Sequence, residues 1–303
     1  MIRGEMILGD PPVSVITAES AGFCFGVKRA MDLVSENIKE QKFPLYTYGP
    51  LIHNETVVKD LSGQGVGILN SGDFTGPQEK NDGTVIIRSH GVSEEILDQL
   101  SATGFSIEDA TCPFVARIHQ LVREYSDSGR TILIAGNPDH PEVRGIIGWI
   151  LPGTEYHVIS SPEEAEALSL PKETGLFLLS QTTFHYEKFQ EIVEILEQKG
   201  YDIYALNTIC SATEVRQKEA ARIAEKADVM LVIGGKNSSN TQKLFDICSK
   251  KCSNTLFVQT AGDLKWPALQ SIQCIGITAG ASTPDKIIEE VQKECQKKVL
   301  NKC

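Results

Sequence analysis

Short apolar runs recur along the chain, and helical or loop sequence separates each run from the next. Four runs in each third of the chain are rich in β-branched and other apolar residues and predict buried strands. They span residues 13–17, 45–49, 66–69, 84–88, 106–110, 131–136, 156–160, 175–180, 202–206, 229–234, 255–259 and 274–278. Because short buried strands alternate with helices, the pattern predicts parallel sheets that helices cover on both faces.

The runs fall into three sets. The first run of each set begins at residue 13, 106 or 202, and the spacing of the fourth runs is similar. This near-even spacing indicates a threefold internal repeat, although residue identity between the sets is low. We therefore predict an α/β fold with three pseudo-repeated lobes, each a four-stranded, mostly parallel sheet flanked by helices, around a central site. The predicted parts are a flexible N-terminal tail and three lobes, at 1–12, 13–105, 106–201 and 202–303, with a C-terminal helix closing the last lobe.

One cysteine lies at the equivalent junction of each predicted lobe, between the first strand and the helix that follows it. These residues are Cys24, Cys112 and Cys210. The positive end of a helix favours a thiolate over a thiol. A single cysteine at such a junction is usually a packing residue, but three at equivalent points indicate a shared site.

Polar residues collect after the second and fourth predicted strands of each lobe. In open parallel sheets, ligands bind beyond the carboxyl ends of the strands. The polar loops are 48–54, 136–142 and 234–240 after second strands, and 89–91, 181–183 and 279–282 after fourth strands. If the lobes face one another, these loops converge on one central site.

Two of these loops, 234–240 and 279–282, are rich in Gly, Ser and Asn and lead into helices. Backbone amides and hydroxyls at such places suit phosphate oxygens, although the same sequences also serve as ordinary turns. His53, His90 and His140 lie in the polar loops and could donate to the same anion. An anion-binding site is therefore one candidate for the central region.

Glu142, next to His140, is the acid in these loops best placed to carry a proton, although it also fits a plain first-turn helix acid. The other histidines and cysteines are expected to be structural. They are His119, His157, His185, Cys248, Cys252, Cys274, Cys295 and Cys303. Cys248 and Cys252 have metal-ligand spacing, but no partner ligands lie near them in the sequence.

Composition narrows the class of protein. The chain has 303 residues, with 29 Lys and Arg against 40 Asp and Glu, for a net charge of −11. This charge argues against nucleic acid or an anionic membrane as a partner, since both require a dominant basic surface. No stretch approaches the ~20 apolar residues of a membrane span, and the N-terminus lacks the features of a signal peptide. We therefore expect a cytoplasmic protein, whose eight cysteines indicate metal or redox chemistry more than disulfides.

Three converging thiolates leave the coordination shell of a metal centre incomplete. A structural zinc normally takes four protein ligands, whereas a catalytic zinc keeps one position open. An iron–sulfur cluster held by three cysteines likewise leaves one iron open to a substrate oxygen. The wide spacing of the three cysteines favours a substrate-binding cluster over a ferredoxin-like one, and catalytic zinc also stays open on these grounds.

Nine ordered segments carry a resemblance to a known family. They are GFCFGV (22–27), IHN (52–54), SHGV (89–92), DATCP (109–113), HPEV (140–143), SQTT (180–183), TICSAT (208–213), KNSSN (236–240) and TAGAS (278–282). From about residue 14 to 290, the chain resembles the 4-hydroxy-3-methylbut-2-enyl diphosphate reductases of the non-mevalonate isoprenoid pathway. The visible departures, an N-terminal extension and a short C-terminal tail, touch none of these motifs.

The resemblance implies a cofactor, a reaction and partners. It implies one [4Fe-4S] cluster per chain on Cys24, Cys112 and Cys210, with an open iron for the substrate hydroxyl. Reductive dehydroxylation then gives isopentenyl and dimethylallyl diphosphate, with reduced ferredoxin or flavodoxin as the electron donor. Glu142 would deliver protons, with Thr182 in the relay. The diphosphate would be held by His53, His90, His140, Ser238, Ser239, Asn240 and Ser282.

Two other functions remain compatible with the residues. The first is a zinc-dependent hydrolase of a phosphorylated metabolite, with the three cysteines on the metal and Glu142 as base. The second is a non-catalytic iron–sulfur sensor that binds a diphosphate. A pure sensor would not need the proton path that Glu142 and Thr182 offer. A measurement of metal content distinguishes the zinc enzyme from the iron–sulfur proteins. We expect a monomer in each case.

Overall fold

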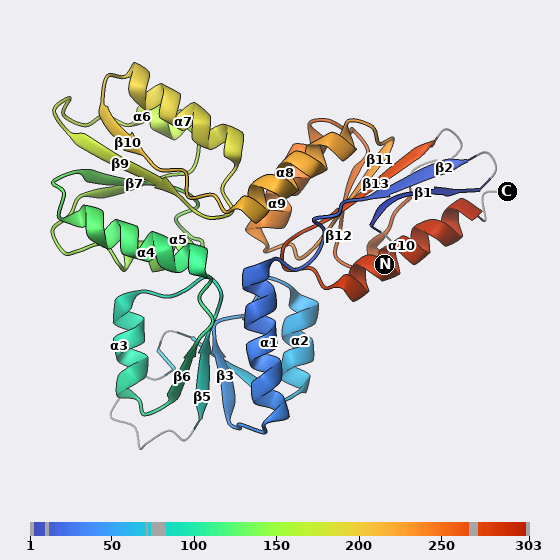
Figure 1. Cartoon of the computed structure of the whole chain (residues 1–303), viewed down its shortest axis with the longest axis horizontal. Helices are drawn as coiled ribbons and strands as arrows, with labels where there is room; N and C mark the ends of the chain where they lie inside the picture. Colours follow the sequence, from blue (N-terminus) through green and yellow to red (C-terminus); the bar gives the residue numbers. More distant parts are fainter. Residues whose placement is uncertain (1–2, 10–11, 71, 74–82, 267–271, 301–303) are drawn as a thin grey trace. The chain divides into compact units, whose positions relative to one another are not determined.

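The computed structural model (Figure 1) describes all residues except 1–2, 10–11, 71, 74–82, 267–271 and 301–303. The described residues divide into two compact units. The first unit comprises 1–27, 52–59 and 211–303, and the second comprises 28–51 and 60–210. Each unit is described by itself.

The first unit contains one five-stranded sheet with the order β1-β2-β13-β11-β12. Its strands are β1 (Gly4–Leu8), β2 (Val13–Thr17), β11 (Val229–Ile233), β12 (Thr255–Val258) and β13 (Cys274–Ala279). All neighbours pair in parallel except β1, which runs antiparallel to β2. The helices α8 (Ser211–Ala224), α9 (Ser239–Ser249) and α10 (Asp285–Leu300) supply apolar side chains to the core of this sheet.

The second unit contains two four-stranded, fully parallel sheets. One has the order β4-β3-β5-β6, and the other β10-β9-β7-β8. The strands of the first are β3 (Leu45–Tyr48), β4 (Val66–Leu69), β5 (Thr84–Ile87) and β6 (Ser106–Asp109). The strands of the second are β7 (Thr131–Ala135), β8 (Tyr156–Ile159), β9 (Gly175–Ser180) and β10 (Asp202–Ala205).

The side chains of β7 show why such strands appear in the sequence as continuous apolar runs. Ile132 and Ile134 pack with α4 (Pro113–Ser126) and α5 (Pro141–Ile147). Leu133 and Ala135 pack on the other face, with α6 (Pro162–Ala167) and α7 (Tyr186–Gln198). A strand buried on both faces needs apolar residues at every position, which is the pattern that the sequence presents.

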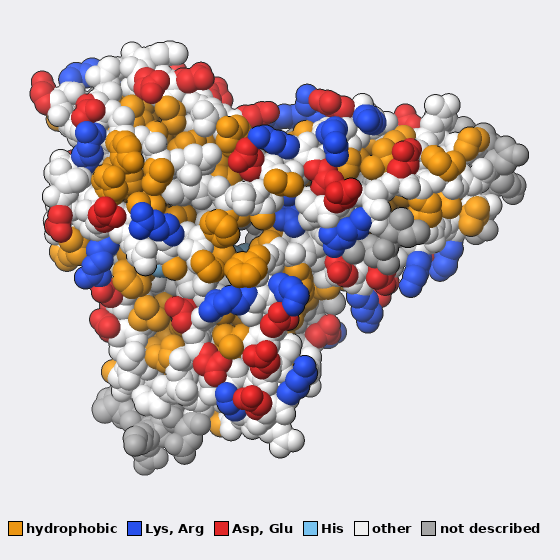
Figure 2. All heavy atoms as spheres, in the orientation of Figure 1, with side chains coloured by type: hydrophobic (Ala, Val, Ile, Leu, Met, Phe, Trp, Pro, Cys, Tyr) orange, Lys and Arg blue, Asp and Glu red, His pale blue; other side chains and the backbone are white. Residues whose placement is uncertain are grey.

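The remaining helices are α1 (Phe25–Lys39), α2 (Glu55–Gly63) and α3 (Glu94–Ala102), with a short 3₁₀ turn at Ala261–Asp263. The predicted α/β class, with three mostly parallel sheets flanked by helices, is confirmed. Within the described residues, no helix has the length and apolar character to cross a membrane. On the face drawn in Figure 2, Lys and Arg are interspersed with Asp and Glu.

Sheet membership differs from the predicted lobes by one strand. The strand that was expected to open each lobe lies instead beside the fourth strand of another set: β6 pairs with β5, β10 with β9, and β2 with β13. Strands joined through a single helix usually become neighbours in one sheet, and β5-α3-β6 and β9-α7-β10 follow this rule. The spacing of apolar runs gives the period of a repeat but not the point at which a sheet ends.

The N-terminal segment also differs from the expected flexible tail. Gly4–Leu8 forms β1, which pairs with β2 from Gly4 opposite Thr17 to Leu8 opposite Val13. Leu8 is half-buried and packs against the core of the sheet, whereas Ile7 is 61% exposed. The strand is short and contributes few apolar side chains, so its pattern in the sequence is weak.

Substitutions in β1 test whether this segment belongs to the folded unit. Leu8→Ala should lower the free energy of unfolding by about 1 kcal/mol or more, because it removes side-chain contacts with the core. Ile7→Ala is the matched control and should change it by less than about 0.5 kcal/mol. Urea-induced unfolding measures both values. Equal, negligible effects would mean that the segment is a tail in solution.

Candidate active site

The three predicted ligand cysteines make the same backbone contact in three places. Each lies directly before a helix, α1, α4 or α8. The N–H of Cys24 donates to Ala281 O at 3.2 Å, that of Cys112 to Ser89 O at 3.0 Å, and that of Cys210 to Thr182 O at 3.1 Å. The accepting residue always follows the strand beside the cysteine's own strand, namely β13, β5 or β9. Strand pairing therefore fixes where each cysteine lies.

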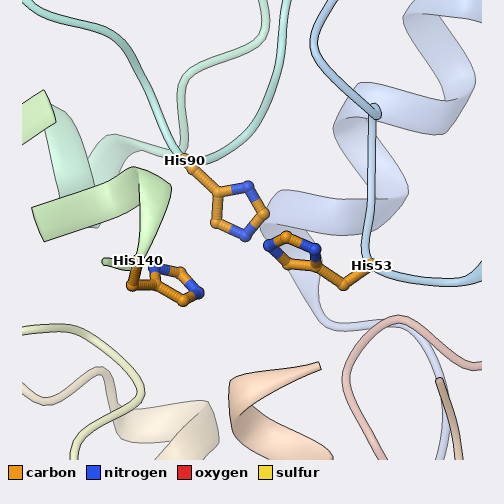
Figure 3. A group of neighbouring side chains, drawn as sticks. All are labelled: His53, His90 and His140. Atoms are coloured by element: carbon orange, nitrogen blue, oxygen red, sulfur yellow. The ribbon is translucent and has the colours of Figure 1, made fainter. Parts of the chain in front are cut away.

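His90 and His140 lie close together in the second unit. His140 is the N-cap residue of α5, and its Nδ1 accepts from the N–H of Glu142 at 3.1 Å. The rings of His90 and His140 meet edge to face, with centroids 5.3 Å apart. Figure 3 shows these two rings and also draws His53, which belongs to the first unit. The two imidazoles of the second unit thus present neighbouring donor groups.

Glu142 is 1% exposed, and Thr182 holds both of its carboxyl oxygens. The backbone N–H of Thr182 donates to Oε1 at 2.6 Å, and its hydroxyl donates to Oε2 at 2.9 Å. Two hydrogen bonds from one residue fix the orientation of the carboxyl plane. A carboxyl held in one orientation is suited to exchange a proton with a group beside it.

A connected set of contacts joins these groups within the second unit. It begins at Cys112, whose N–H meets the loop that carries His90, and continues from His90 to His140. It then passes through Glu142 to Thr182, whose carbonyl accepts the N–H of Cys210. The structure therefore brings together all predicted site residues of this unit.

The first unit gathers a second polar set at the start of α9. Ser238 caps this helix by accepting from the N–H of Thr241 at 3.3 Å. The hydroxyl of Ser282 lies 3.4 Å from that of Ser238 and donates to His53 O at 3.2 Å. Asn240 is 5% exposed, and both polar atoms of its amide are buried without a hydrogen-bond partner among the described residues. Buried amides are normally paired, so this amide indicates a place for a polar ligand.

Glycine keeps the surrounding backbone close. A Cβ on Gly235 would lie 2.4 Å from His53 O, and one on Gly280 would lie 2.0 Å from Thr241 Oγ1. Neither position can carry a side chain without moving its neighbours. Close packing therefore explains why these two loops have glycine at these positions. Ser239 differs from the rest of the predicted set, since its hydroxyl accepts from Lys243 at 2.7 Å.

Asn54 is a polar residue of this set that was not singled out from the sequence. Its side-chain amide donates to Ser282 O at 3.1 Å, and its Oδ1 accepts from the N–H of Val57 at 3.3 Å. It therefore ties the segment of His53 to the loop after β13. Its place in the polar loop 48–54 was the available signal, but its partner lies far along the chain.

The other cysteines and histidines have structural surroundings where they are described. Burial raises the pKa of Cys248 and of Cys295 to about 12, so both remain thiols. Burial lowers the pKa of His119 to about 4, and its ring stacks on Trp149 at 5.2 Å. His185 is the buried N-cap residue of α7, and Cys303 lies outside the described residues.

Comparison with known proteins gives a consistent result. The family model described as LytB protein matches residues 15–296. A 4-hydroxy-3-methylbut-2-enyl diphosphate reductase of Caldanaerobacter subterraneus subsp. tengcongensis is 44% identical over 280 residues, covering 92% of this chain and 95% of the relative. The corresponding protein of Geobacter sulfurreducens is 40% identical over 284 residues, covering 94% and 97%.

Two solved structures are similar as well. One, described as (E)-4-hydroxy-3-methyl-but-2-enyl diphosphate reductase, the terminal enzyme of the non-mevalonate pathway, has 38% identity and a TM-score of 0.67 and covers 93% of this chain and 99% of that one. The other, an E-1-hydroxy-2-methyl-but-2-enyl-4-diphosphate reductase from Plasmodium falciparum, has 29% identity and a TM-score of 0.83 and covers 93% and 87%. On family match, identity and coverage, the chain belongs to the LytB family and is an oxidoreductase of the non-mevalonate pathway.

Proposed function

We propose that this protein reduces (E)-4-hydroxy-3-methylbut-2-enyl diphosphate to isopentenyl and dimethylallyl diphosphate. The names of the relatives support the substrate and the reaction class. The observation that carries the proposal is the Glu142–Thr182 pair, which lies in the same set of contacts as the backbones of Cys112 and Cys210. A proton-carrying carboxyl is thereby joined to two of the three predicted metal ligands.

Cys24, Cys112 and Cys210 are the proposed ligands of a [4Fe-4S] cluster. These three side chains are partly exposed, whereas Cys248, Cys252 and Cys295 are buried. When bound, a cluster with three cysteine ligands supplies electrons and one iron open to a substrate oxygen. Each cysteine precedes a helix, whose positive end stabilises the thiolate that ligation requires.

The diphosphate is assigned to the two polar sets. In the first unit, Ser238 and Ser282 offer hydroxyls, and the unpartnered amide of Asn240 offers a donor, with His53 on the adjoining segment. In the second unit, the neighbouring rings of His90 and His140 offer imidazole donors. Ser239, which is bonded to Lys243, is the least supported member of the proposed set.

The reaction consumes two electrons and two protons. The C–O bond of the allylic hydroxyl breaks, its oxygen leaves as water, and a C–H bond forms at one or the other end of the allyl group. Glu142 is assigned the proton that goes to the leaving oxygen, with the Thr182 hydroxyl holding the carboxyl at Oε2. Reduced ferredoxin or flavodoxin is the proposed electron donor, and the proposed active species is a monomer.

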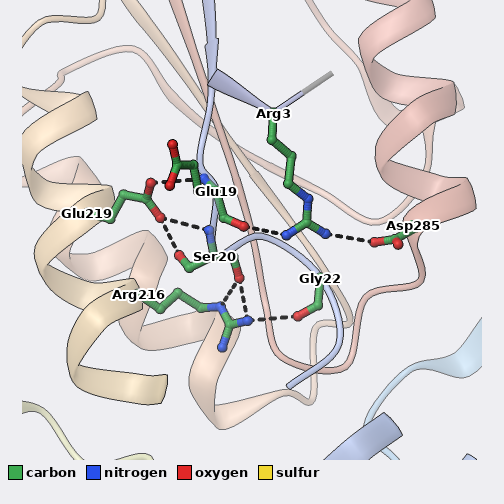
Figure 4. Close-up of polar contacts among 7 residues, drawn as sticks. All are labelled: Arg3, Glu19, Ser20, Gly22, Arg216, Glu219 and Asp285. Atoms are coloured by element: carbon green, nitrogen blue, oxygen red, sulfur yellow. Dashed lines mark hydrogen bonds and ion pairs between the residues drawn. The ribbon is translucent and has the colours of Figure 1, made fainter. Parts of the chain in front are cut away.

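Arg216 and Glu219 of α8 are proposed as positioning residues for Cys24 (Figure 4). Arg216 is 3% exposed and donates from Nε to Ser20 O at 3.0 Å and from Nη2 to Gly22 O at 2.8 Å. Glu219 accepts from the N–H groups of Glu19 and Ser20, both at 2.9 Å. Burial alone would raise the pKa of Glu219, but these hydrogen bonds and that of the Ser20 hydroxyl hold the pKa below its ordinary value.

These contacts fix the backbone just before Cys24 from a helix that begins one residue after Cys210. The carbonyls of Ser20 and Gly22 accept hydrogen bonds from a buried guanidinium, and these bonds hold the backbone of the loop in one conformation. Figure 4 also shows Arg3, whose guanidinium bridges Glu19 O and the carboxylate of Asp285.

Metal analysis tests the proposal and its main alternative. Protein purified without oxygen should contain iron and sulfide, absorb visible light, and reduce the diphosphate substrate with an artificial reductant. Cys112→Ser should lose most of the iron, whereas Cys274→Ser, a half-buried cysteine outside the site, should retain it. Stoichiometric zinc without iron would favour a hydrolase, and an iron protein that binds substrate without turnover would favour a sensor.

Glu142→Gln tests the proton-delivery role. The amide is nearly isosteric, so the iron content and the binding of substrate should remain. Turnover should fall by about 100-fold or more, the scale of lost general acid catalysis. Glu191→Gln, an exposed acid on α7, is the control and should leave turnover unchanged. Unimpaired reduction by Glu142→Gln would remove Glu142 from the mechanism.

Arg216→Met tests the positioning role. It should lower the free energy of unfolding by about 1.5–3 kcal/mol, since two buried carbonyls lose a charged donor. Amide hydrogen exchange in residues 19–24 should accelerate, and the iron content should fall. Lys218→Met, at an exposed lysine of the same helix that pairs with Glu214, should show none of these effects. If residues 19–24 exchange as in the parent protein, Arg216 does not hold the loop.

A further inference from the structure

A cavity lies in the second unit, and its lining differs from the residues assigned to the reaction. It has a volume of about 380 Å³ and lies between the loops after β3, β4 and β5 and the helices α3 and α5. None of the predicted catalytic, substrate-binding or cysteine residues lines it. The lining residues that matter here are Tyr48, Arg88, Val92, Ile96, Pro141 and Arg144.

Arg88 brings an uncompensated positive charge to this cavity. Its Nε is buried and has no hydrogen-bond partner in the described part of the chain, and no ion pair of Arg88 occurs there. Its guanidinium carbon lies 6.0 Å from the centre of the Tyr48 ring. Burial lowers the pKa of Arg88, and the charge of Arg144 adds to that effect. Desolvation of a charged group is costly unless a partner compensates it, so a partly buried guanidinium with an unpartnered Nε favours an anion here.

The backbone makes room for the guanidinium. Gly49 has a φ of +67°, and a Cβ at this position would lie 2.4 Å from Nη1 of Arg88. A side chain at residue 49 would therefore displace the guanidinium from the wall of the cavity. The glycine serves both a left-handed turn after β3 and the placement of Arg88.

Arg144 supplies a second positive charge at the rim. Its Nη2 lies 3.0 Å from Oδ1 of Asp139, but the two side chains are 66% and 84% exposed. An ion pair this exposed contributes little free energy and is readily exchanged for another anion. None of the described lining residues is acidic. Among the residues described there, the cavity therefore presents two guanidinium groups and no carboxylate.

We propose that this cavity binds a small organic anion through Arg88 and Arg144. The planar fork of a guanidinium matches the oxygens of a phosphate or a carboxylate. Val92, Ile96 and Pro141 provide an apolar wall for a short carbon skeleton. The volume lies within the range of small-molecule sites. The ligand class is thus a phosphorylated or carboxylated metabolite of low molecular mass.

A ligand bound in this cavity would contact segments that carry candidate active-site residues. Arg88 is two residues before His90, and the carbonyl of Arg88 accepts the N–H of Gly91 at 3.0 Å. Pro141 and Arg144 lie on α5, which also carries Glu142. A bound anion would therefore contact the two segments that position His90 and Glu142.

Thermal unfolding and isothermal titration of the full chain test the proposal, with inorganic phosphate, diphosphate and citrate as probes. At least one probe should raise the melting temperature in a saturable manner. Arg88→Met should weaken its binding by about tenfold or more, the scale of a lost charged hydrogen bond. The probe that binds most tightly distinguishes a phosphate ligand from a carboxylate.

Two controls separate this cavity from the diphosphate site and from general charge effects. Asn240→Ala, in the first unit, and Arg117→Met, an exposed arginine on α4, should both retain probe binding. Without probe, Arg88→Met should be about as stable as the parent protein, because it removes a partly buried charge that has no ion pair among the described residues. Should it fail to fold, Arg144→Met at the exposed rim provides the same test. Undiminished binding by the folded arginine variant, or no binding of any probe by the parent protein, would overturn the proposal.

Discussion

The candidate site depends on one repeated constraint, the parallel pairing of two neighbouring strands. One strand leads to a cysteine, and the loop after the other strand accepts the backbone N–H of that cysteine. β2, β6 and β10 pair with β13, β5 and β9, and the three cysteines then donate to carbonyls 3.0–3.2 Å away. A backbone hydrogen bond places the cysteine without using its sulfur. Cys112 illustrates this, since it is the N-cap residue of α4 but its side chain does not cap the helix.

The same loops serve chemistry as well as architecture. Thr182 accepts the N–H of Cys210 with its carbonyl and holds Glu142 with its N–H and hydroxyl. One residue therefore determines both the place of a proposed metal ligand and the orientation of a proposed acid. Because both roles fall on short, buried segments, a shift of either group would disturb the other. We regard this coupling as the physical basis of the proposed proton delivery.

Two arginines of the molecule differ in how their charge is compensated. The guanidinium of Arg216 is surrounded by carbonyls and contributes to the loop before Cys24. The guanidinium of Arg88 borders a cavity whose described lining residues include no acid. Burial of a charge is tolerated when hydrogen bonds or a counter-ion compensate it. The first is therefore a structural element, and the second is the reason for proposing a ligand.

The sequence by itself determined the described strands other than β1, the α/β class and the position of each cysteine before a helix, because apolar periodicity and helix starts are local properties of the chain. It also identified Glu142 and Thr182 as candidate site residues, through the motifs that resemble those of a known family. Only the tertiary structure decided that β6 and β10 join the preceding sheet and that residues 4–8 form β1. It alone placed Asn54 against Ser282, Arg216 against Ser20, and Arg88 in a cavity. Those contacts join residues distant in the sequence, and no local pattern encodes which partner a polar side chain will meet.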